Sequence, residues 1–400
     1  MRVLQLCLKP PVPARDGGCI AMHNITRGLL ALGHRVRILT IVTHKHPFDP
    51  VSMGETYMEQ TDIQGVFVDT KVNLVDAFSS MITQDSYNIS RFFSPDFDMI
   101  LGRVLKEETF DVIHLESLFM TPYIGTIRRF SKASIVLRSH NLEHVIWERM
   151  ASGTRNPAKR AYIKYLSKKL KEYETAVMHD VDGIAAISAS DTLHFQELQC
   201  SAPVATIPFG IDFDHYQPEL KKNSEISLFH IGAMDWTPNI EGIMWFIDEV
   251  WPLVKLKMPQ VKLYLAGRGL TPDFLEVTDD SIVVVGEVES ASAFMKSHDI
   301  MVVPLLTAGG IRVKTIEAMA LAKAVVTTSI GLEGIDAEHG NQVICEDEPE
   351  AMAASIVALI QHPDRILQLG NQARNLVESH FDNKRIIDKL VSFYESIGKP

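Results

Sequence analysis

The sequence predicts an α/β protein of two domains, each built around a mostly parallel β-sheet. Three observations support this prediction: a length of 400 residues, short apolar runs that alternate with segments of helical periodicity, and one polar, turn-rich interruption of this pattern. At roughly 100–200 residues per domain, such a length corresponds to two domains, or three. Alternating strand-like and helix-like segments are typical of βαβ units around a parallel sheet.

The first series of strand-like runs predicts an N-terminal domain over residues 1–209. Each run is short, apolar and followed by a segment with helical spacing, such as residues 19–32 after the first run. The predicted strands cover residues 3–8, 36–42, 111–115, 134–137 and 183–187.

The interruption is a predicted linker at residues 210–224, where Pro, Gly and charged residues replace any apolar period. The second series follows it and predicts a C-terminal domain over residues 225–378. Its strands are expected at residues 227–231, 261–266, 282–285, 300–303, 324–327 and 343–345. Residues 379–400 predict a final amphipathic helix, because Ile386, Leu390 and Tyr394 recur at helical spacing. Its apolar face needs a partner surface, on either domain.

Composition and charge exclude several classes of protein. The formal charge of -11 would repel phosphate backbones over most of the surface, so we expect no nucleic acid partner. The four cysteines are far apart and form no C-x-x-C pair, which indicates neither a zinc site nor a disulfide framework and fits a cytoplasmic setting. The first apolar run is too short for a signal peptide, and no apolar run is long enough to span a membrane.

The loop after the first strand ends in Gly17 and Gly18, just before a helix. Glycines there would let a ligand approach free backbone amides, which suit a phosphate or a sugar oxygen. A tight strand-to-helix turn also needs glycine, so the pair supports a binding loop and a plain turn about equally.

The segment 303–320 carries the strongest chemical signal. A buried strand ends, Gly309, Gly310 and Ile311 follow, and a helix opens that carries Arg312, Lys314 and Glu317. Helix amides, the helix dipole and two cations within one turn would hold a diphosphate, and Glu317 would accept hydrogen bonds from ribose hydroxyls. Neither G-x-G-x-x-G nor a Walker A loop occurs, so nicotinamide chemistry and NTP hydrolysis lack their usual motifs.

This segment resembles the Glu-x7-Glu signature of retaining GT-B glycosyltransferases of family 4. Glu317 matches the second glutamate, whereas Gly309 stands at the position of the first. Residues 17–18, 138–143, 186–191 and 207–212 match further family motifs in the same order along nearly the whole chain. The resemblance implies the GT-B fold: two Rossmann-like, doubly wound α/β domains facing a central cleft, with the C-terminal helix able to pack back on the first domain.

The chain also departs from the family at the Gly-Arg-x4-Lys-Gly element. Residues 232–242 occupy that place without either cation, and they include Trp236, which is either a packing residue or a ligand contact. The sequence is similar here to a subset of the family found in bacterial exopolysaccharide and envelope-glycan pathways. In that subset Arg312 and Lys314 would neutralise the donor diphosphate instead.

The resemblance assigns roles to the remaining candidates. His140 would contact the donor sugar, and Arg312 and Lys314 would be the other two catalytic residues. Gly267 and Val288 would hold the nucleoside base, and Gly309, Gly310, Ile311 and Glu317 the rest of the donor, while Gly17 and Gly18 form the acceptor or phosphate loop. Arg138 and Glu143 are interpreted as a solvated ion pair.

Residues 149–171 contain eight basic residues and no acidic one. The same segment has an apolar helical face, formed by Ala158, Ala161, Tyr162, Tyr165, Leu166, Leu170 and Tyr173. Such a helix either lies on an anionic bilayer beside a lipid-linked acceptor or packs on its own domain with its cations in water.

Together these observations predict a retaining glycosyltransferase that moves a hexose-type sugar from a nucleotide-diphosphate donor to a hydroxyl of a glycan or glycolipid acceptor. We expect cell-surface polysaccharide synthesis, no metal and no cofactor, and a cytoplasmic protein, which would be peripheral at the inner face of the membrane if residues 149–171 lie on the bilayer. The alternatives are a nucleotide-sugar epimerase on the same fold and a non-catalytic protein that binds sugar nucleotides.

Overall fold

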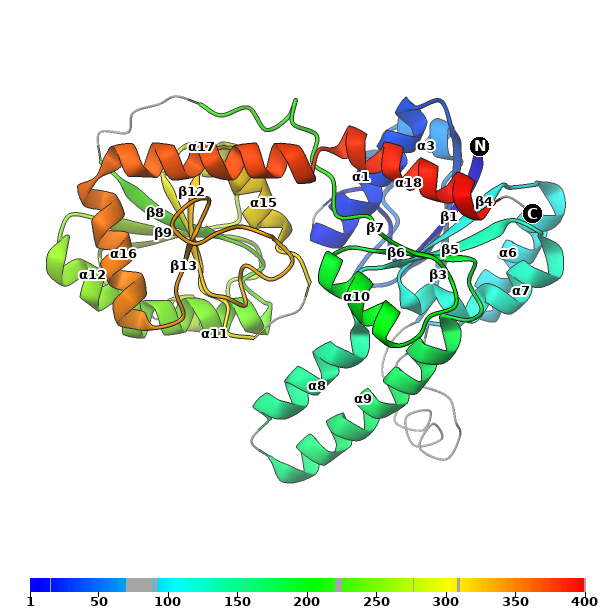
Figure 1. Ribbon diagram of the computed structural model, residues 1–400, viewed down its shortest axis with the longest axis horizontal. Helices are drawn as coiled ribbons and strands as arrows, with labels where there is room; N and C mark the ends of the chain where they lie inside the picture. Colours follow the sequence, from blue (N-terminus) through cyan, green and yellow to red (C-terminus); the bar gives the residue numbers. More distant parts are fainter. Residues whose placement is uncertain are drawn as a thin grey trace. The chain divides into compact units, whose positions relative to one another are not determined.

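The chain forms two compact units in the computed structural model, which describes residues 1–14, 16–69, 89, 92–154, 156–219, 225–275, 277–307 and 310–398 (Figure 1). The first unit comprises Met1–Gly210 and Asn383–Pro400, and the second comprises Ile211–Asp382. The chain therefore passes from one unit to the other twice. The predicted linker begins at the first crossing, and its residues 220–224 lie outside the described part.

The first unit is built on a parallel sheet with the strand order β3-β2-β1-β4-β5-β6-β7. Its strands are β1 Arg2–Cys7, β2 Arg35–Val42, β3 Gln64–Phe67, β4 Val112–Glu116, β5 Ser134–Ser139, β6 Gly183–Ala186 and β7 Val204–Thr206. The edge strands β3 and β7 were absent from the sequence prediction, because each is short and half-buried and so lacks a continuous apolar run. Both pair in parallel with their neighbours.

Two apolar clusters cover the two faces of this sheet. One cluster includes residues of α1 (Gly17–Ala31) and α18 (Asn383–Ile397), which contact each other. The other includes residues of α6 (Pro95–Glu107), η1 (Leu118–Tyr123), α7 (Ile124–Phe130), α9 (Pro157–Val177) and α10 (Ala189–Glu197). Among the residues that the structure describes, the first unit also contains the helices α2 (Pro50–Met53), α3 (Glu55–Thr61) and α8 (Glu143–Gly153).

The C-terminal helix α18 packs on the first unit, where Ile387 and Leu390 are fully buried. Ile387 lies where the side chain of any larger residue at Gly28 of α1 would stand, which explains the close contact of the two helices. The expected start of this helix at residue 379 is early, because α17 (Pro363–His380) extends beyond that point and α18 begins at Asn383.

The second unit contains a smaller parallel sheet with the order β10-β9-β8-β11-β12-β13. Its strands are β8 Ser227–Ile231, β9 Lys262–Ala266, β10 Ile282–Gly286, β11 Ile300–Val303, β12 Ala324–Thr327 and β13 Ile344–Cys345. Its helices are α11 Thr237–Trp245, η2 Phe246–Val250, α12 Trp251–Lys257, α13 Pro272–Leu275, α14 Ala291–Lys296, α15 Val313–Ala320, α16 Pro349–Gln361 and α17. The predicted fold of two doubly wound α/β domains is confirmed.

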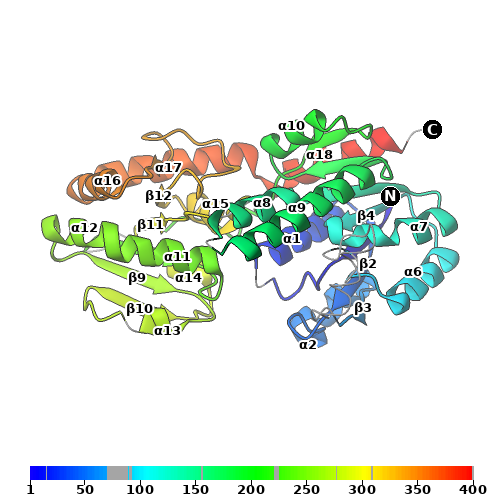
Figure 2. The same ribbon diagram turned by 90° about the horizontal axis from the view of Figure 1, so that it is seen from below.

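Helices α8 and α9 lie side by side as an antiparallel pair (Figures 1 and 2), which extends from the rest of the first unit in Figure 1. A buried hydrogen bond joins them: His144 Nδ1 of α8 lies 2.5 Å from Glu174 Oε2 of α9. Ser167 Oγ of α9 donates a further hydrogen bond to the His144 carbonyl oxygen at 2.9 Å. In the described part of the chain, no helix combines the length and hydropathy that crossing a membrane requires.

Candidate active site

Each sheet has one topological switch point, where the strand order reverses. In the first unit this point lies between β1 and β4, and in the second between β8 and β11. Open α/β sheets bind ligands in the crevice beyond the carboxyl ends of the strands at such points. Ligand-binding residues of each unit are therefore expected at these two edges.

The loop after β11 brings the candidate donor-binding residues to the switch point of the second unit. Helix α15 begins at Val313, so Arg312 is the residue that caps the helix, while Lys314 and Glu317 lie in its first turns. Lys314 is 32 % exposed, and its Nζ lies 2.7 Å from Glu317 Oε2. The other carboxylate oxygen, Glu317 Oε1, accepts a hydrogen bond of 2.5 Å from the hydroxyl of Tyr216.

Arg312 is held in place by two neighbours. Its Nη2 donates to the carbonyl oxygen of Gly310 at 2.6 Å, and its guanidinium lies 5.6 Å from the centre of the Trp236 ring. A cation above the face of an indole is stabilised by the ring quadrupole. Trp236, at the start of α11, is 38 % exposed, so it orients the guanidinium from the surface of the unit and is not a core residue.

Gly310 and Ile311 belong to the same loop, whereas Gly309 lies outside the described residues. Gly310 has a φ of +77°, a left-handed conformation that glycine adopts without strain. Ile311 packs against Gly334, where an added Cβ would stand 2.5 Å from the isoleucine side chain. This contact fixes the end of the loop just before the helix begins.

Gly267 and Val288 lie after β9 and β10, at the same edge of the sheet. Gly267 is buried with a φ of +151°, and an added Cβ would stand 1.7 Å from the carbonyl oxygen of Gly232, which follows β8. The close backbone approach requires glycine here. Val288 is half-buried two residues after the end of β10.

In the first unit, His140 and Glu116 meet at the switch-point edge. Glu116 is the last residue of β4, and His140 follows β5, its parallel neighbour. His140 Nε2 lies 2.8 Å from Glu116 Oε2; the glutamate is fully buried, and the histidine is 21 % exposed. The ring is thus fixed by a buried carboxylate at one nitrogen.

Glu116 is the centre of a buried polar cluster. Its Oε1 accepts a hydrogen bond from Gln5 Nε2 at 2.8 Å and lies 3.2 Å from His114 Nε2. Burial on its own raises the pKa of a carboxyl, but His114 and His140 together hold the pKa of Glu116 well below its usual range. An ionised carboxylate can only accept hydrogen bonds, so His140 donates its Nε2 proton to Glu116.

The interpretation of Arg138 and Glu143 as a solvated pair is wrong. Arg138 is 1 % exposed, and its Nε lies 3.7 Å from Glu116 Oε2. Glu143 instead begins α8, where its backbone N–H donates to Glu174 Oε1. The register of β4 and β5 places Arg138 directly beside Glu116, and this pairing cannot be seen from residues 138–143 alone.

Gly17 and Gly18 lie in the first turn of α1, but that turn is already capped. The Asp16 carboxylate accepts from Cys19 N at 3.0 Å and pairs with Lys9 Nζ at 2.7 Å. Burial works against ionisation, yet Lys9 and the Cys19 amide lower the pKa of Asp16 to about 2. An ionised aspartate disfavours a phosphate at this position, so the loop suits a neutral sugar hydroxyl better.

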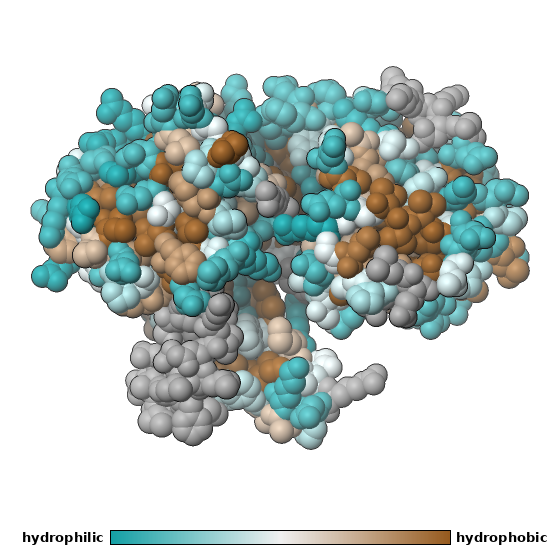
Figure 3. Space-filling view, turned by 180° about the vertical axis from the view of Figure 1, so that it is seen from behind, coloured by the Kyte–Doolittle hydropathy of each residue, from teal (hydrophilic) through white to brown (hydrophobic). Residues whose placement is uncertain are grey.

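Residues 149–171 fall on two helices, α8 and α9, which differs from the single helix expected. Leu166 and Leu170 are buried, whereas Ala158, Ala161 and Tyr162 are exposed. The predicted apolar face is therefore divided: its later part packs within the unit and its first turns extend beyond it. Figure 3 shows hydrophilic and hydrophobic residues side by side on this lower part of the molecule.

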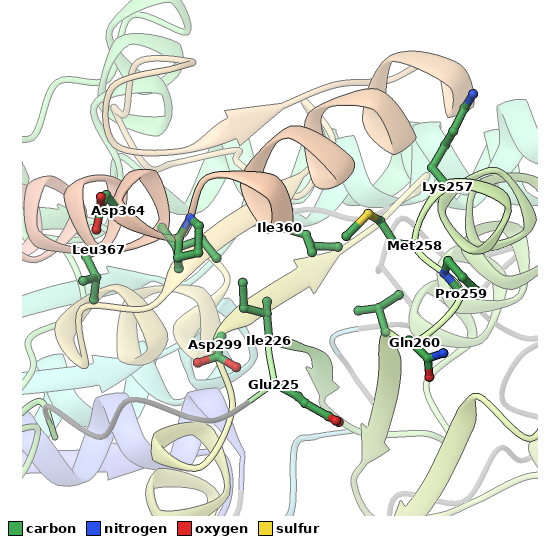
Figure 4. Close-up of a pocket in the computed structure, with 13 residues that line it drawn as sticks. Glu225, Ile226, Lys257, Met258, Pro259, Gln260, Asp299, Ile360, Asp364 and Leu367 are labelled. Carbon is green, nitrogen blue, oxygen red and sulfur yellow. The ribbon is translucent and has the colours of Figure 1, made fainter.

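A cavity of about 550 Å³ lies at the opposite edge of the second sheet (Figure 4). Ile226, Val261 and Asp299, which line it, each precede a strand, so the cavity is at the amino ends of β8, β9 and β11. The candidate donor residues lie at the carboxyl ends. The cavity is therefore separate from them.

Sequence reasoning missed Glu116, His114 and Tyr216. His114 and Glu116 are two residues apart and so lie on the same face of β4, and polar, ionisable residues in a buried strand are a signal that was available. Tyr216 lies in a turn-rich segment whose composition gives no such signal. The described residues contain no group of three or more His, Cys, Asp or Glu arranged to hold a metal ion.

Comparison with known proteins agrees with this architecture. The family described as Glycosyltransferase Family 4 matches residues 16–215, and the one described as Glycosyl transferases group 1 matches residues 225–362. Sucrose-phosphate synthase from Thermosynechococcus elongatus has a similar fold, with a TM-score of 0.75 at 15% identity over 99% of both chains. The fold and the two matches define the class, a glycosyltransferase with the GT-B fold.

Within this class, the chain belongs to glycosyltransferase family 4. A relative at 22% identity is an uncharacterized 44.6 kDa protein in the cps region of Klebsiella pneumoniae, matched over 95% of this chain and 96% of that protein. Anabaena HepE, solved in complex with UDP and glucose, has a similar fold, with a TM-score of 0.66 at 15% identity over 98% of this chain and 99% of HepE.

Proposed function

We propose that this glycosyltransferase moves a hexose-type sugar from a nucleotide-diphosphate donor to a hydroxyl of a glycan or glycolipid, with retention of anomeric configuration. The observation that carries the proposal is the start of α15, where Arg312, Lys314 and Glu317 lie within two helical turns of the switch point. The two cations and the helix amides suit a diphosphate, and the carboxylate suits ribose hydroxyls. Gly267 and Val288 line the same edge for the base.

The proposed reaction needs stabilisation of the leaving group above all. As the bond between the anomeric carbon and the β-phosphate oxygen breaks, negative charge develops on the phosphate, and Arg312, Lys314 and the helix amides stabilise it. The acceptor oxygen bonds to the anomeric carbon on the face that the phosphate leaves, and its proton passes to the departing phosphate oxygen. His140, oriented by Glu116, contacts the sugar, and Gly17 and Gly18 contact the acceptor.

The pathway and the place of action are part of the same proposal. The cps region in which the Klebsiella relative lies supports a role in cell-surface polysaccharide synthesis. The exposed cations of the α8–α9 pair support a peripheral position on anionic lipid at the cytoplasmic face of the membrane.

Binding and stereochemistry test the proposal in sequence. A thermal-shift screen of UDP, GDP, ADP and their sugars identifies the base, because a ligand at 100 times its Kd raises the stability by about 2.7 kcal/mol. Proton NMR of the product made from that sugar nucleotide and an acceptor pool is expected to show a retained anomeric configuration. Conversion of the donor without acceptor would indicate an epimerase, and tight binding without any turnover would indicate a non-catalytic protein.

A further inference from the structure

Glu317 is a buried carboxylate whose two oxygens have different partners. It is 2 % exposed. The hydroxyl of Tyr216 donates to Oε1 at 2.5 Å, across 101 residues of sequence, and Lys314 Nζ lies 2.7 Å from Oε2 on the same helix. A buried carboxylate needs such partners, because an unpaired charge in the interior is strongly unfavourable.

Tyr216 is fixed independently of any ligand. Arg374 of α17 donates from Nη1 to the Tyr216 carbonyl oxygen at 2.6 Å, and its guanidinium lies 5.4 Å from the centre of the Phe213 ring. Glu378, one turn further along α17, holds the same guanidinium at 2.8 Å. The segment that carries Tyr216 is therefore anchored on α17, in a position from which the Tyr216 hydroxyl reaches Glu317.

Lys314 is the more easily displaced of the two partners. Its side chain is partly exposed and its ammonium is a point charge on a flexible stem, so it can turn toward another anion at the start of α15. A nucleoside diphosphate brings more negative charge than one carboxylate and so competes for this cation. When Lys314 leaves, Glu317 Oε2 loses its partner, and ribose hydroxyls can donate there.

We propose that Lys314 exchanges Glu317 for the donor diphosphate, while Tyr216 acts as the positioning residue that keeps the Glu317 carboxylate oriented toward the ribose hydroxyls. This inference rests on the proposed function, since it concerns the same nucleotide site. A carboxylate accepts at about four positions, so the Tyr216 bond leaves room for two hydroxyl donors. Lys314 then couples recognition of the ribose to recognition of the diphosphate.

The first arm of the test measures discrimination between ribose and deoxyribose. Isothermal titration of the full-length protein with UDP and 2′-deoxy-UDP, or with the GDP or ADP pair if that base binds, gives the ratio of the two Kd values. We expect the wild-type protein to prefer the ribonucleotide by about tenfold or more. Tyr216→Phe is expected to reduce this preference to less than about threefold, because the unheld carboxylate turns away from the hydroxyls.

The matched control is Tyr264→Phe, which removes a tyrosine hydroxyl from β9 of the same unit. It should keep the wild-type ratio of Kd values. If Tyr216→Phe also keeps that ratio while binding the nucleotide, Tyr216 is not a positioning residue and the inference is overturned. If the wild-type protein binds none of the nucleotides, the proposed function fails, and the inference fails with it.

The second arm tests the partner exchange through Lys314→Met. This variant should bind the diphosphate at least tenfold more weakly, because a charge-assisted contact is lost. It should bind the free nucleoside as well as the wild-type protein or better, because Glu317 Oε2 no longer has a competing cation. Equal weakening toward nucleoside and nucleoside diphosphate would overturn the exchange.

Discussion

His140 Nε2 and the Glu116 carboxylate lie 2.8 Å apart, although 24 residues separate them in the chain. They meet because β4 and β5 are parallel neighbours that end at the same edge of the sheet, with Glu116 in register with Arg138. A carboxylate behind an imidazole selects one tautomer and fixes the ring orientation. This relationship makes the role of His140 testable through a residue that itself is fully buried.

Glu116→Gln should lower kcat by about tenfold to a hundredfold with little change in the donor KM. The amide keeps the shape of the side chain but removes the charge that holds the His140 N–H, and a hydrogen bond to a charged group contributes about 1.5–3 kcal/mol. Steady-state kinetics with the identified donor measure this, and the control is Glu172→Gln on α9. A wild-type kcat and pH profile in Glu116→Gln would show that the function of His140 does not depend on Glu116.

Arg312→Ala is expected to reduce transfer about tenfold to a thousandfold without altering the folded fraction, because its contact with the leaving diphosphate strengthens in the transition state. Initial rates and circular dichroism of the purified variant measure both quantities. Lys257→Ala serves as the control, since this lysine lines the cavity at the opposite edge of the sheet. Undiminished turnover in Arg312→Ala would show that Arg312 is not part of the active site.

His230 makes the stability depend on pH. Burial in β8 lowers the pKa of His230 to about 4, despite its hydrogen bond to the Val302 carbonyl oxygen. The unfolded chain therefore takes up the proton first as the pH falls below about 6.5, and the stabilisation is lost progressively until the pH reaches the folded-state pKa. Between about pH 8 and pH 5 this residue should cost about 2 kcal/mol of unfolding free energy.

Urea denaturation of wild-type protein and of His230→Leu across this pH range isolates that contribution. The variant should be less stable at pH 7, since it lacks the bond to Val302, but it should lose about 2 kcal/mol less on acidification. Identical losses in both proteins would show that folding does not shift the pKa of His230, and would contradict this prediction.

Chelation is expected to leave transfer intact. The positive charge that other transferases obtain from a divalent cation is here assigned to Arg312, Lys314 and the start of α15. Rates measured after EDTA treatment, with and without added magnesium or manganese, decide this. Full inhibition that either metal restores would contradict the proposed mechanism.

Neutralising four lysines of α9 should remove most binding to anionic vesicles while nucleotide affinity stays unchanged. Each cation near such a surface contributes about 1 kcal/mol. The variant carries glutamine at Lys164, Lys168, Lys169 and Lys171. Co-sedimentation with phosphatidylserine-containing vesicles at low and high salt measures the effect.

A control variant with the same change of charge carries glutamine at Lys255, Lys257, Lys262 and Lys296, all in the second unit. It should bind vesicles as the wild-type protein does. Absence of wild-type binding even at low salt would make α9 a structural helix with solvated cations.

The sequence by itself determined the fold class and most of the strands. The runs at residues 227–231, 300–303 and 324–327 coincide with β8, β11 and β12, because strands buried on both faces must be continuously apolar. The same logic failed for β3 and β7, whose edge positions demand no such run. The motif around Arg312, Lys314 and Glu317 was visible because the first two turns of one helix bring those residues together.

Only the tertiary structure decided the partners of these residues. Glu116 meets His140 through strand register, and Tyr216 reaches Glu317 through a segment anchored on α17, so both pairs depend on contacts across long stretches of chain. Likewise, the amphipathic pattern of α18 required an apolar partner surface but did not identify the domain that provides it. The structure shows that this partner is α1 in the first unit. Local periodicity specifies which face of a segment must be buried. The packing of segments that are distant in sequence decides which surface covers that face.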